Sequence, residues 1–555
     1  MNFLLRVHFF IIAPLMFPAW LAPRFGDHWF TRIERLGARL ACKKRLMVMA
    51  VAVGAILIRV ALLPMMPVPV PGVHDEFSYL LAGDTFAHGR LANPPHAMWV
   101  FFETFHVLQH PTYSSIYPPA QGAALALGQL LGHPWLGALL SAGVMCGAIL
   151  WALQGWLPPG WALLGGILAM LRVGLVSDWV NSYWGGAMAA IGGALVIGAF
   201  PRVIHQQRVR HALLMGLGAA ILANSRPLEG LIFCAPVAVS LLMWPFSARH
   251  VNLKRVSLRV FLPLVLVSTC LLVFVGYYNW RVTRDPLLLP EALDSRLYTN
   301  YPVFLWQHPK PPLQYLNPQF DQFYNHVQAS VTPRTLRWSI LAKSHKIWFF
   351  FLGTTFSLSL ITMPNLLRDR RMRLVVIQFV VSFLGALGVA WSFPHYFAPL
   401  TATIYILVVQ MLRHLRRLKF GWKPAGLYLT RLIVMLAFAR PFVVVGYAMQ
   451  NRGADWRHSR AEIVNRLNGT PGKHLVLVCY QPNHYVDHEW VYNAADIDNS
   501  KIVWARMIPG RDLKPLLEYF KERRAWQLNA DVAGGELQSY SASDPPCVFE
   551  RAPAH

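Results

Sequence analysis

The sequence has few charged residues for its length. Only 14% of its 555 residues are Asp, Glu, Lys or Arg, whereas a soluble protein usually carries about 25%. Hydrophobic residues make up 55% of the chain. Apolar stretches of roughly 17 to 25 residues, long enough to cross a bilayer as a helix, recur through residues 46–448. This scarcity of charge excludes a water-soluble globular protein for most of the chain.

Acidic residues are the scarcer kind of charge. There are 26 Asp and Glu against 51 Lys and Arg, which gives a formal net charge of +25. An excess of this size suits nucleic acid, but the basic residues lie in short loops between apolar stretches. Such loops set the orientation of membrane proteins and meet lipid headgroups. We therefore expect membrane lipids, and no nucleic acid, as partners. The basic loops are 24–45, 202–210, 249–259, 368–373 and 413–423.

Cysteines and several catalytic motifs are also scarce. None of the six cysteines has metal-ligand spacing, so no metal site is predicted, although a requirement for a divalent ion stays open. The segment 483–489 is rich in potential ligands but matches no zinc signature, and a polar surface loop explains it better. No phosphate-cradling glycine loop and no G-x-S-x-G motif occurs, which argues against an ATP-driven pump or a serine hydrolase.

The hydrophobic pattern divides the chain into three parts. Residues 1–44 form a cytoplasmic or interfacial segment, 45–448 an all-α membrane domain of about eleven spans, and 449–555 a soluble domain. Residues 7–22 fit either an interfacial helix or an extra span. The apolar segment 119–132 is too short to span easily, so we expect it to be partly inserted or re-entrant.

The basic loops also predict which side each part faces. Lys43, Lys44 and Arg45 precede the first span and place its start in the cytoplasm. The outer loops 67–118 and 281–345 and the C-terminal domain then face the opposite side. Strand-like stretches at 474–480 and 501–504, between helix-like stretches at 460–467 and 513–524, predict an α/β fold for this domain. In an oxidising compartment its two cysteines, Cys479 and Cys547, are able to form a disulfide.

An acidic pair, Asp75 and Glu76, opens the first outer loop. A carboxylate at the membrane surface is able to act as a general base, removing the proton from an acceptor hydroxyl as it attacks an anomeric carbon. The alternative is that both acids only cap the helix that follows, because acids favour helix N-termini. The spacing alone leaves the two interpretations open.

The order of these residues resembles the first outer loop of the GT-C superfamily of membrane glycosyltransferases. An acidic pair after the first span is followed by Tyr79 and Ala82 at helical spacing, a glycine-containing turn, and Tyr117-Pro118-Pro119 entering an apolar helix. The branch with protein O-mannosyltransferases, aminoarabinose transferase and Rgt-like bacterial enzymes is the most similar. The resemblance covers roughly the N-terminal 230 residues. Ala120-Gln121-Gly122 departs from the family pattern, which leaves the acceptor open.

This resemblance implies a fold, a reaction and a location. The fold is GT-C-like, with an extracytoplasmic α/β domain in a bacterial cytoplasmic (inner) membrane protein. The reaction is inverting hexosyl or pentosyl transfer from a polyprenyl-phosphate donor to an envelope lipid, glycan or protein. It implies Asp75 as the base, Glu76 as the reserve base, and Asp178 as a helper that orients the acceptor or the base.

Substrate-binding candidates follow from the same resemblance. Arg226 lies in a basic Gly/Pro turn and suits the donor phosphate, because guanidinium groups bind phosphate in a bidentate manner. The other candidates are Glu229, Tyr117, His395, Tyr396 and Lys346, whereas Arg281 and Arg284 fit interfacial anchors. The alternative function is a membrane transporter or a non-catalytic polymer-assembly protein. Acids that line a membrane-deep path would favour it.

Overall fold

The structure, a computed structural model, describes residues 24–541 apart from 25, 248–251, 301, 328–334, 392, 420, 422, 452–454 and 533–534. Residues 7–22 and Cys547 lie outside the described part of the chain, so their topology and pairing stay predictions. Cys479 is disulfide-bonded.

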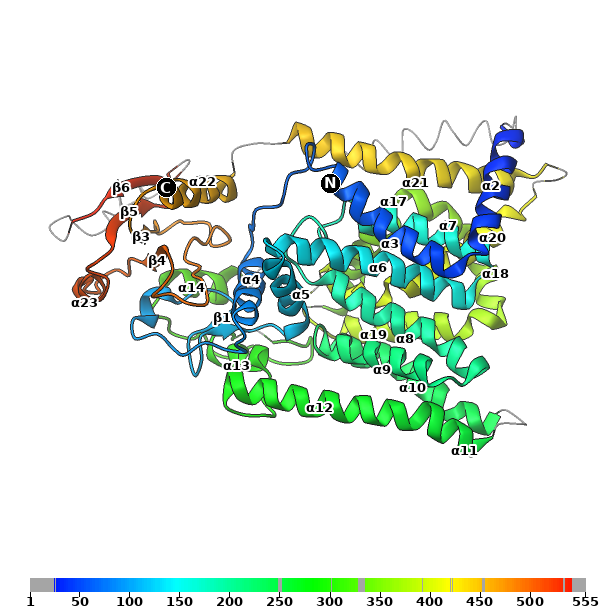
Figure 1. Cartoon of the computed structure of the whole chain (residues 1–555), viewed down its shortest axis with the longest axis horizontal. Helices are drawn as coiled ribbons and strands as arrows, with labels where there is room; N and C mark the ends of the chain where they lie inside the picture. The colour runs from blue at the N-terminus through cyan, green and yellow to red at the C-terminus, as the bar shows by residue number, and fades with distance from the viewer. Residues whose placement is uncertain are drawn as a thin grey trace.

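Apolar helices run side by side along the long axis of the molecule and form one bundle (Figure 1). In the N-terminal half these are α3 (Lys44–Ala61), α6 (Pro134–Trp156), α7 (Pro159–Ala169) with its π-helical extension η2 (Met170–Gly174), α8 (Gly186–Gln206), α9 (Val209–Ala223) and α10 (Pro227–Ser247). In the C-terminal half they are α11 (Leu253–Val256), η3 (Ser257–Phe261) and α12 (Leu262–Thr283), then α16 (Leu336–Ile347), η5 (Trp348–Leu352), α17 (Gly353–Ser357), η6 (Leu358–Thr362) and α18 (Met363–Arg368), then η7 (Arg370–Met372) with α19 (Arg373–Leu387), η8 (Pro394–Leu400) with α20 (Thr401–Arg416), and α21 (Ala425–Gln450).

Seven helices of the described residues are long and apolar enough to cross a membrane, and two shorter apolar helices accompany them. The protein is therefore a mostly helical, polytopic membrane protein, as the sequence predicts, while the count of about eleven spans stays a prediction. Segment 119–132 contains α5 (Pro119–Leu130), a helix of 12 residues. That length is too short to cross a hydrocarbon core.

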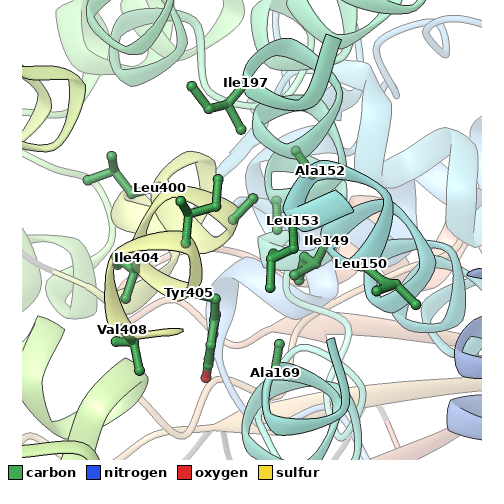
Figure 2. Packing of buried hydrophobic residues seen from close by; sticks show 14 of the residues in the cluster. Ile149, Leu150, Ala152, Leu153, Ala169, Ile197, Leu400, Ile404, Tyr405 and Val408 are labelled. Atoms are coloured by element: carbon green, nitrogen blue, oxygen red, sulfur yellow. The ribbon is translucent and has the colours of Figure 1, made fainter. Parts of the chain in front are cut away.

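Helix α20 occupies the centre of the bundle. In Figure 2, Tyr405 lies on the side of α20 toward Ile149 and Leu153 of α6, whereas Ile404 and Val408 lie on the opposite side of α20. These side chains are buried. Because the chain surrounds α20 with protein while α12 keeps a largely exposed apolar surface, α20 is a core helix and α12 a peripheral, lipid-facing one.

Short elements gather at one end of the bundle, on the left in Figure 1. They come from the two long loops and surround the start of α4. These elements are α4 (His74–Ala87), η1 (Trp99–Phe102), the two-stranded β1 (Val107–Leu108) and β2 (Ser114–Ser115), α13 (Pro290–Leu297), α14 (Pro318–Phe320) and the π-helical η4 (Asp321–Val327).

The C-terminal domain is a small α/β domain, as predicted. Helix α22 (Trp456–Gly469) precedes a four-stranded sheet of order β4-β3-β5-β6, with β3 parallel to β4 and β5, and β6 antiparallel to β5. The strands are β3 (His474–Cys479), β4 (Ile502–Arg506), β5 (Arg524–Asn529) and β6 (Glu536–Ser539). The predicted helix 513–524 is shorter, α23 (Lys514–Tyr519), because Arg524 already pairs in the sheet.

This domain packs directly on the first outer loop. Leu475 and Leu477 of β3 share a hydrophobic core with Phe77 and Leu81 of α4. A second cluster joins Val486 of the domain to Phe105 of the first outer loop and to η4 of the second. The end of the bundle that carries the two long loops is thus covered by the C-terminal domain.

The basic loops lie at the opposite end. Helix α2 (Asp27–Ala41), α11 and α18, which belong to or border three of these loops, lie far from the C-terminal domain (Figure 1). This separation agrees with the orientation that the basic loops predict, with the C-terminal domain outside.

Candidate functional site

Asp75 lies in the first turn of α4 at the covered end of the bundle. The Tyr117 hydroxyl donates a hydrogen bond to its Oδ1 atom. Burial, and then the Asp75 charge, raise the pKa of the Tyr117 phenol well above its ordinary value, so the phenol stays a donor. The Tyr79 ring stacks on Tyr117 with centroids 4.4 Å apart. The carboxylate is thus held on one oxygen, and it is only half-buried.

Glu76 has a different environment from its neighbour. It is buried, and its Oε2 accepts hydrogen bonds from the Gly72 amide at 2.8 Å and the Val73 amide at 3.3 Å. Its Oε1 accepts one from the Tyr183 amide at 3.0 Å. Burial raises the pKa of this carboxyl, opposed by these three amides. Helix capping therefore accounts for Glu76, which favours Asp75 as the base.

Arg226 forms the charged centre of the site, immediately before α10. Its guanidinium lies 4.7 Å from the centroid of the Tyr396 ring. Burial lowers the Arg226 pKa, but Tyr79, Glu229 and Glu291 outweigh it, so the pKa rises above its ordinary value. Both acids act electrostatically on Arg226, and among the described residues no hydrogen bond joins their side chains to it. The guanidinium therefore stays positively charged and keeps its N–H donors available to a ligand.

Two small cavities are lined by sequence neighbours and contact partners of this arginine, although not by Arg226 itself. The first is lined by Pro118, Asn224 and Pro227 on one side and by Tyr278 and Glu291 on the other. The second lies between α10, α19 and η8 and is mostly apolar. Its polar lining comes from Glu229, Ser382 and Tyr396. Both cavities are mostly apolar with a few polar groups, a lining that suits an amphipathic ligand whose head meets the nearby charge.

The corner around residue 395 brings a second cation to the same place. Lys346 Nζ lies 4.6 Å from the centroid of the Phe393 ring, and that ring stacks on His395 at 5.5 Å. His395 is buried and in turn contacts Tyr396, with ring centroids 4.9 Å apart. Arg226 and Lys346 both act electrostatically on His395. Two cations thus converge on one aromatic corner.

Asp178 lies apart from this cluster. The residue as a whole has an exposed surface. The protein around its carboxyl group nevertheless shields that group from water, and this desolvation raises its pKa. Within the described residues, no hydrogen bond or charge interaction links it to Asp75 or Arg226. Its loop is nevertheless attached to α4, because the Tyr183 amide bonds Glu76. The structure thus brings Asp75, Tyr117, Arg226, Glu229, His395, Tyr396 and Lys346 together and leaves Asp178 in the adjoining loop.

Two further residues of this region escaped the sequence analysis. Glu291, at the start of α13, lines the first cavity. Burial raises its pKa, Arg226 opposes this shift, and Glu229 and Asp75 reinforce it. His106 has a left-handed backbone, with φ of 60°, and a buried Nδ1 without a hydrogen-bond partner among the described residues. Burial lowers the His106 pKa to about 4. Pro290, a frequent first residue of helices, is the only local signal for Glu291.

Three other charged residues have structural partners. Lys343 is buried and donates to Ser339 and to backbone carbonyls at the end of α19. Arg59 donates to Asn181 at 2.8 Å and lies over the Trp135 ring. Arg281 bonds Tyr277 on the surface of α12 at 3.1 Å, as expected for an interfacial anchor. These contacts argue against a ligand-binding role for the three residues.

The ligand-rich segment 483–489 is also built into the fold. His484 pairs with Asp531 at 2.7 Å, and Glu489 forms a buried ion pair with Arg506. His74 Nε2 lies 2.9 Å from the Val486 carbonyl oxygen, which joins this segment to α4. Across the part of the chain that the structure describes, no group of three or more His, Cys, Asp or Glu is arranged to hold a metal ion.

A bundle of apolar helices with a charged, cavity-lined cluster at one end, covered by an α/β domain, defines a polytopic membrane protein with a site at the membrane boundary. No protein-family model and no curated protein matches the chain.

Solved structures do match. ArnT from Cupriavidus metallidurans bound to undecaprenyl phosphate is 15% identical over 87% of this chain and 92% of that one, with a TM-score of 0.49. The Archaeoglobus fulgidus oligosaccharyltransferase in the apo form is 12% identical over 81% of this chain and 65% of that one, with a TM-score of 0.48. The same archaeal enzyme, AglB, with an inhibitory peptide and a dolichol-phosphate is 10% identical over 88% and 69%, with a TM-score of 0.40.

All three matches have identities of 15% or less and TM-scores below 0.5. At such low identities and TM-scores they assign no residue a role. The function is therefore argued from the geometry of this chain.

Proposed function

We propose that the protein is a membrane glycosyltransferase that moves a sugar from a polyprenyl-phosphate-linked donor to an envelope lipid, glycan or protein. The reaction takes place on the outer face of a bacterial inner membrane. One arrangement carries this proposal: Arg226 lies over the Tyr396 ring and interacts electrostatically with Tyr79, and Tyr79 stacks on the Tyr117 ring whose hydroxyl bonds Asp75. A phosphate-binding cation and a carboxylate base thus share one site. Undecaprenyl phosphate and dolichol-phosphate, bound in the similar structures, are ligands of this chemistry.

In the proposed mechanism Asp75 accepts a proton from the acceptor, and Arg226 binds the leaving phosphate. An acceptor hydroxyl oxygen attacks the anomeric carbon of the donor sugar, and its proton passes to the Asp75 carboxylate. The bond between that carbon and the phosphate oxygen breaks, with inversion at the carbon. The polyprenyl phosphate leaves with the electron pair of this bond. Tyr117 keeps Asp75 oriented through its hydrogen bond.

The leaving phosphate needs positive charge around it. Arg226 suits a bidentate contact, and Lys346 and His395 adjoin it at the aromatic corner. Glu229 and Glu291 hold the guanidinium charged in the absence of the phosphate. Asp178, in the neighbouring loop, is the helper for the acceptor in this proposal. A divalent ion stays open as an addition to this set.

The alternative, a transporter, has less support. A transporter would be expected to carry acidic residues along a path through the interior of the membrane domain. The acids of the site, Asp75, Glu229 and Glu291, gather at the covered end, whereas Arg172 within the bundle is bonded to the backbone carbonyl of Phe350 at 2.9 Å. Arg440 likewise bonds the Arg172 carbonyl at 3.3 Å. These contacts favour a structural role for the membrane-depth charges.

The test replaces Asp75 by Asn. Mass spectrometry of envelope lipids and glycans, in cells with and without the protein, first identifies donor and acceptor. We then expect Asp75→Asn to lower the transfer rate in membranes by roughly two to four orders of magnitude, because the amide keeps the size of the side chain but accepts no proton. Membrane insertion and abundance should not change, since Asn caps helices about as well as Asp.

Glu76→Gln is the matched control. It removes the charge that caps α4, so we expect the variant to have lower thermal stability. Its transfer rate shows whether Glu76, rather than Asp75, acts as the base. Unaltered transfer in both variants would reject the catalytic interpretation of this loop. A separate test concerns orientation: reporter fusions after Arg210, Arg255 and Arg371 should report cytoplasm, and fusions in the C-terminal domain should report the outside.

A further inference from the structure

Helix α2 lies across the end of the bundle that is far from the C-terminal domain (Figure 1). One of its faces is fastened to α20 and α21 by ion pairs. Arg431 Nη1 lies 2.8 Å from Asp27 and its Nε 3.3 Å from Glu34. Arg416 binds both oxygens of Glu34, at 2.8 and 2.7 Å. Because Arg431 is only 6% exposed, these pairs form a docking contact and fix the rotation of the helix about its axis.

This fixed rotation leaves an apolar flank uncovered. Trp29, Ile33, Leu36 and Leu40 are between 38% and 69% exposed. Their spacing of four, three and four residues places them on one stripe of the helix. Four large apolar side chains in one stripe are costly to expose to water.

The other flank of α2 carries only positive charge. Arg32, Arg35 and Arg39 are exposed and follow one another at three and four residues. The acids of the helix, Asp27 and Glu34, point instead to the docking face, where Arg416 and Arg431 neutralise them. A helix with one apolar and one basic flank lies in the plane of a membrane interface. Basic side chains at that depth attract anionic headgroups.

We propose that α2 is an in-plane helix of the cytoplasmic leaflet that binds anionic phospholipid. The flank Trp29, Ile33, Leu36 and Leu40 inserts between acyl chains, and Arg32, Arg35 and Arg39 contact the negatively charged headgroups. The adjacent α3 supports this placement, because it begins at Lys44, directly after α2, and exposes Met49, Val53 and Leu57 toward the same apolar surroundings. This proposal does not depend on the glycosyltransferase function.

The experiment measures the depth of a fluorophore on two flanks of α2. Purified protein in which Cys42, Cys234 and Cys270 are serine carries the label at Ile33→Cys or at His28→Cys, an exposed position next to the basic flank. Single copies are placed in nanodiscs of phosphatidylcholine, with or without phosphatidylglycerol. We expect a spin-labelled acyl chain to quench the label at position 33 several-fold more than aqueous iodide does, and the reverse at position 28.

The charge requirement is tested by R32Q, R35Q and R39Q combined. Each arginine near an anionic surface contributes roughly fivefold to binding. In the parent protein we therefore expect phosphatidylglycerol to draw the label at position 33 deeper into the bilayer, which is measured as stronger quenching by the spin-labelled acyl chain. In the triple variant we expect no such increase. The matched control, R368Q, R370Q and R371Q combined, removes three exposed arginines from the same end and should keep the effect.

Two results would overturn the proposal. Equal access of iodide to positions 33 and 28, in both lipid compositions, would mean that the flank faces water. Protection of position 33 only in discs that hold two copies would assign the flank to a second copy of the chain.

Discussion

The arginine of the outer site and the arginine inside the C-terminal domain meet carboxylates in different ways. Arg506 is buried, forms an ion pair with Glu489, and donates to Gln319 at 3.2 Å. Tyr480 donates to the other Glu489 oxygen. Arg226 has a ring beneath it and two acids that act only through their charge. An arginine paired directly with a buried carboxylate stabilises the fold, whereas one that meets its acids only through charge is suited to a ligand.

This difference predicts opposite consequences of substitution. We expect Glu489→Gln to lower the free energy of unfolding by about 3–5 kcal/mol, because it leaves the Arg506 charge buried without its partner. Thermal unfolding of the purified protein measures the loss. Arg457→Gln is the control, since its ion pair with Asp455 is largely exposed and contributes about 0–1 kcal/mol. Similar losses in the two variants would contradict the assignment of Arg506 to the fold.

A pH dependence is expected from Asp294, one turn after Glu291 on α13. Burial, and then Glu291, raise the pKa of Asp294 to about 7, against about 3.9 in an unfolded chain. The folded state therefore binds a proton that the unfolded state has lost, and stability should fall as the pH rises from about 4 to 7.

Asp294→Asn removes the carboxyl group that binds this proton in the folded state. We expect thermal unfolding of the variant to depend less on pH, with a gain of up to about 4 kcal/mol above pH 7. Asp285→Asn, an exposed position of the same loop, should keep the parent slope. A slope unchanged in Asp294→Asn would mean that this carboxyl is ionised in the folded protein.

The smallest expected effect separates Arg226 from an anchoring arginine. Arg226→Gln should weaken use of the lipid-linked donor roughly 10- to 100-fold, the range for a lost charged hydrogen bond. Its effect on thermal stability should be smaller than that of Glu489→Gln. Arg281→Gln, which changes a surface arginine bonded to Tyr277, should leave donor use nearly unaltered. Kinetics in membranes over a range of donor concentrations measure both, and equal small effects would make both residues anchors.

Much of this arrangement could be predicted from the sequence, because the membrane restricts what each segment can be. The length of the apolar stretches predicted the helical bundle, and two short, nearly continuous apolar runs predicted β3 and β4. Asp75 was found because it follows the first span directly. The pairing of Glu76 with Tyr183 could not be foreseen, since it depends on how the loop 177–183 returns to α4.

Glu291 and His106 show why the rest was missed. Glu291 lies in a long loop without periodicity, and only the packing of α13 against Asn279 and Tyr278 of α12 brings it to the first cavity. His106 gains its character from a left-handed backbone and from burial. Neither property has a sequence signal, because both arise from contacts between distant segments. Strand β5 was not predicted, and only its first residue, Arg524, falls within the predicted helix 513–524, because its pairing with β3 is likewise non-local.

The contact between His74 and the Val486 carbonyl joins two segments that are synthesised at different times. Translation runs from the N-terminus toward the C-terminus, so His74 is made 412 residues before the Val486 that accepts from it. Until then His74 lacks its acceptor, and Phe105 lacks the Val486 side chain that packs against it. The membrane helices are thus made before the end of the bundle that carries Asp75 is covered. A chain that stops before the α/β domain lacks the wall that this domain provides.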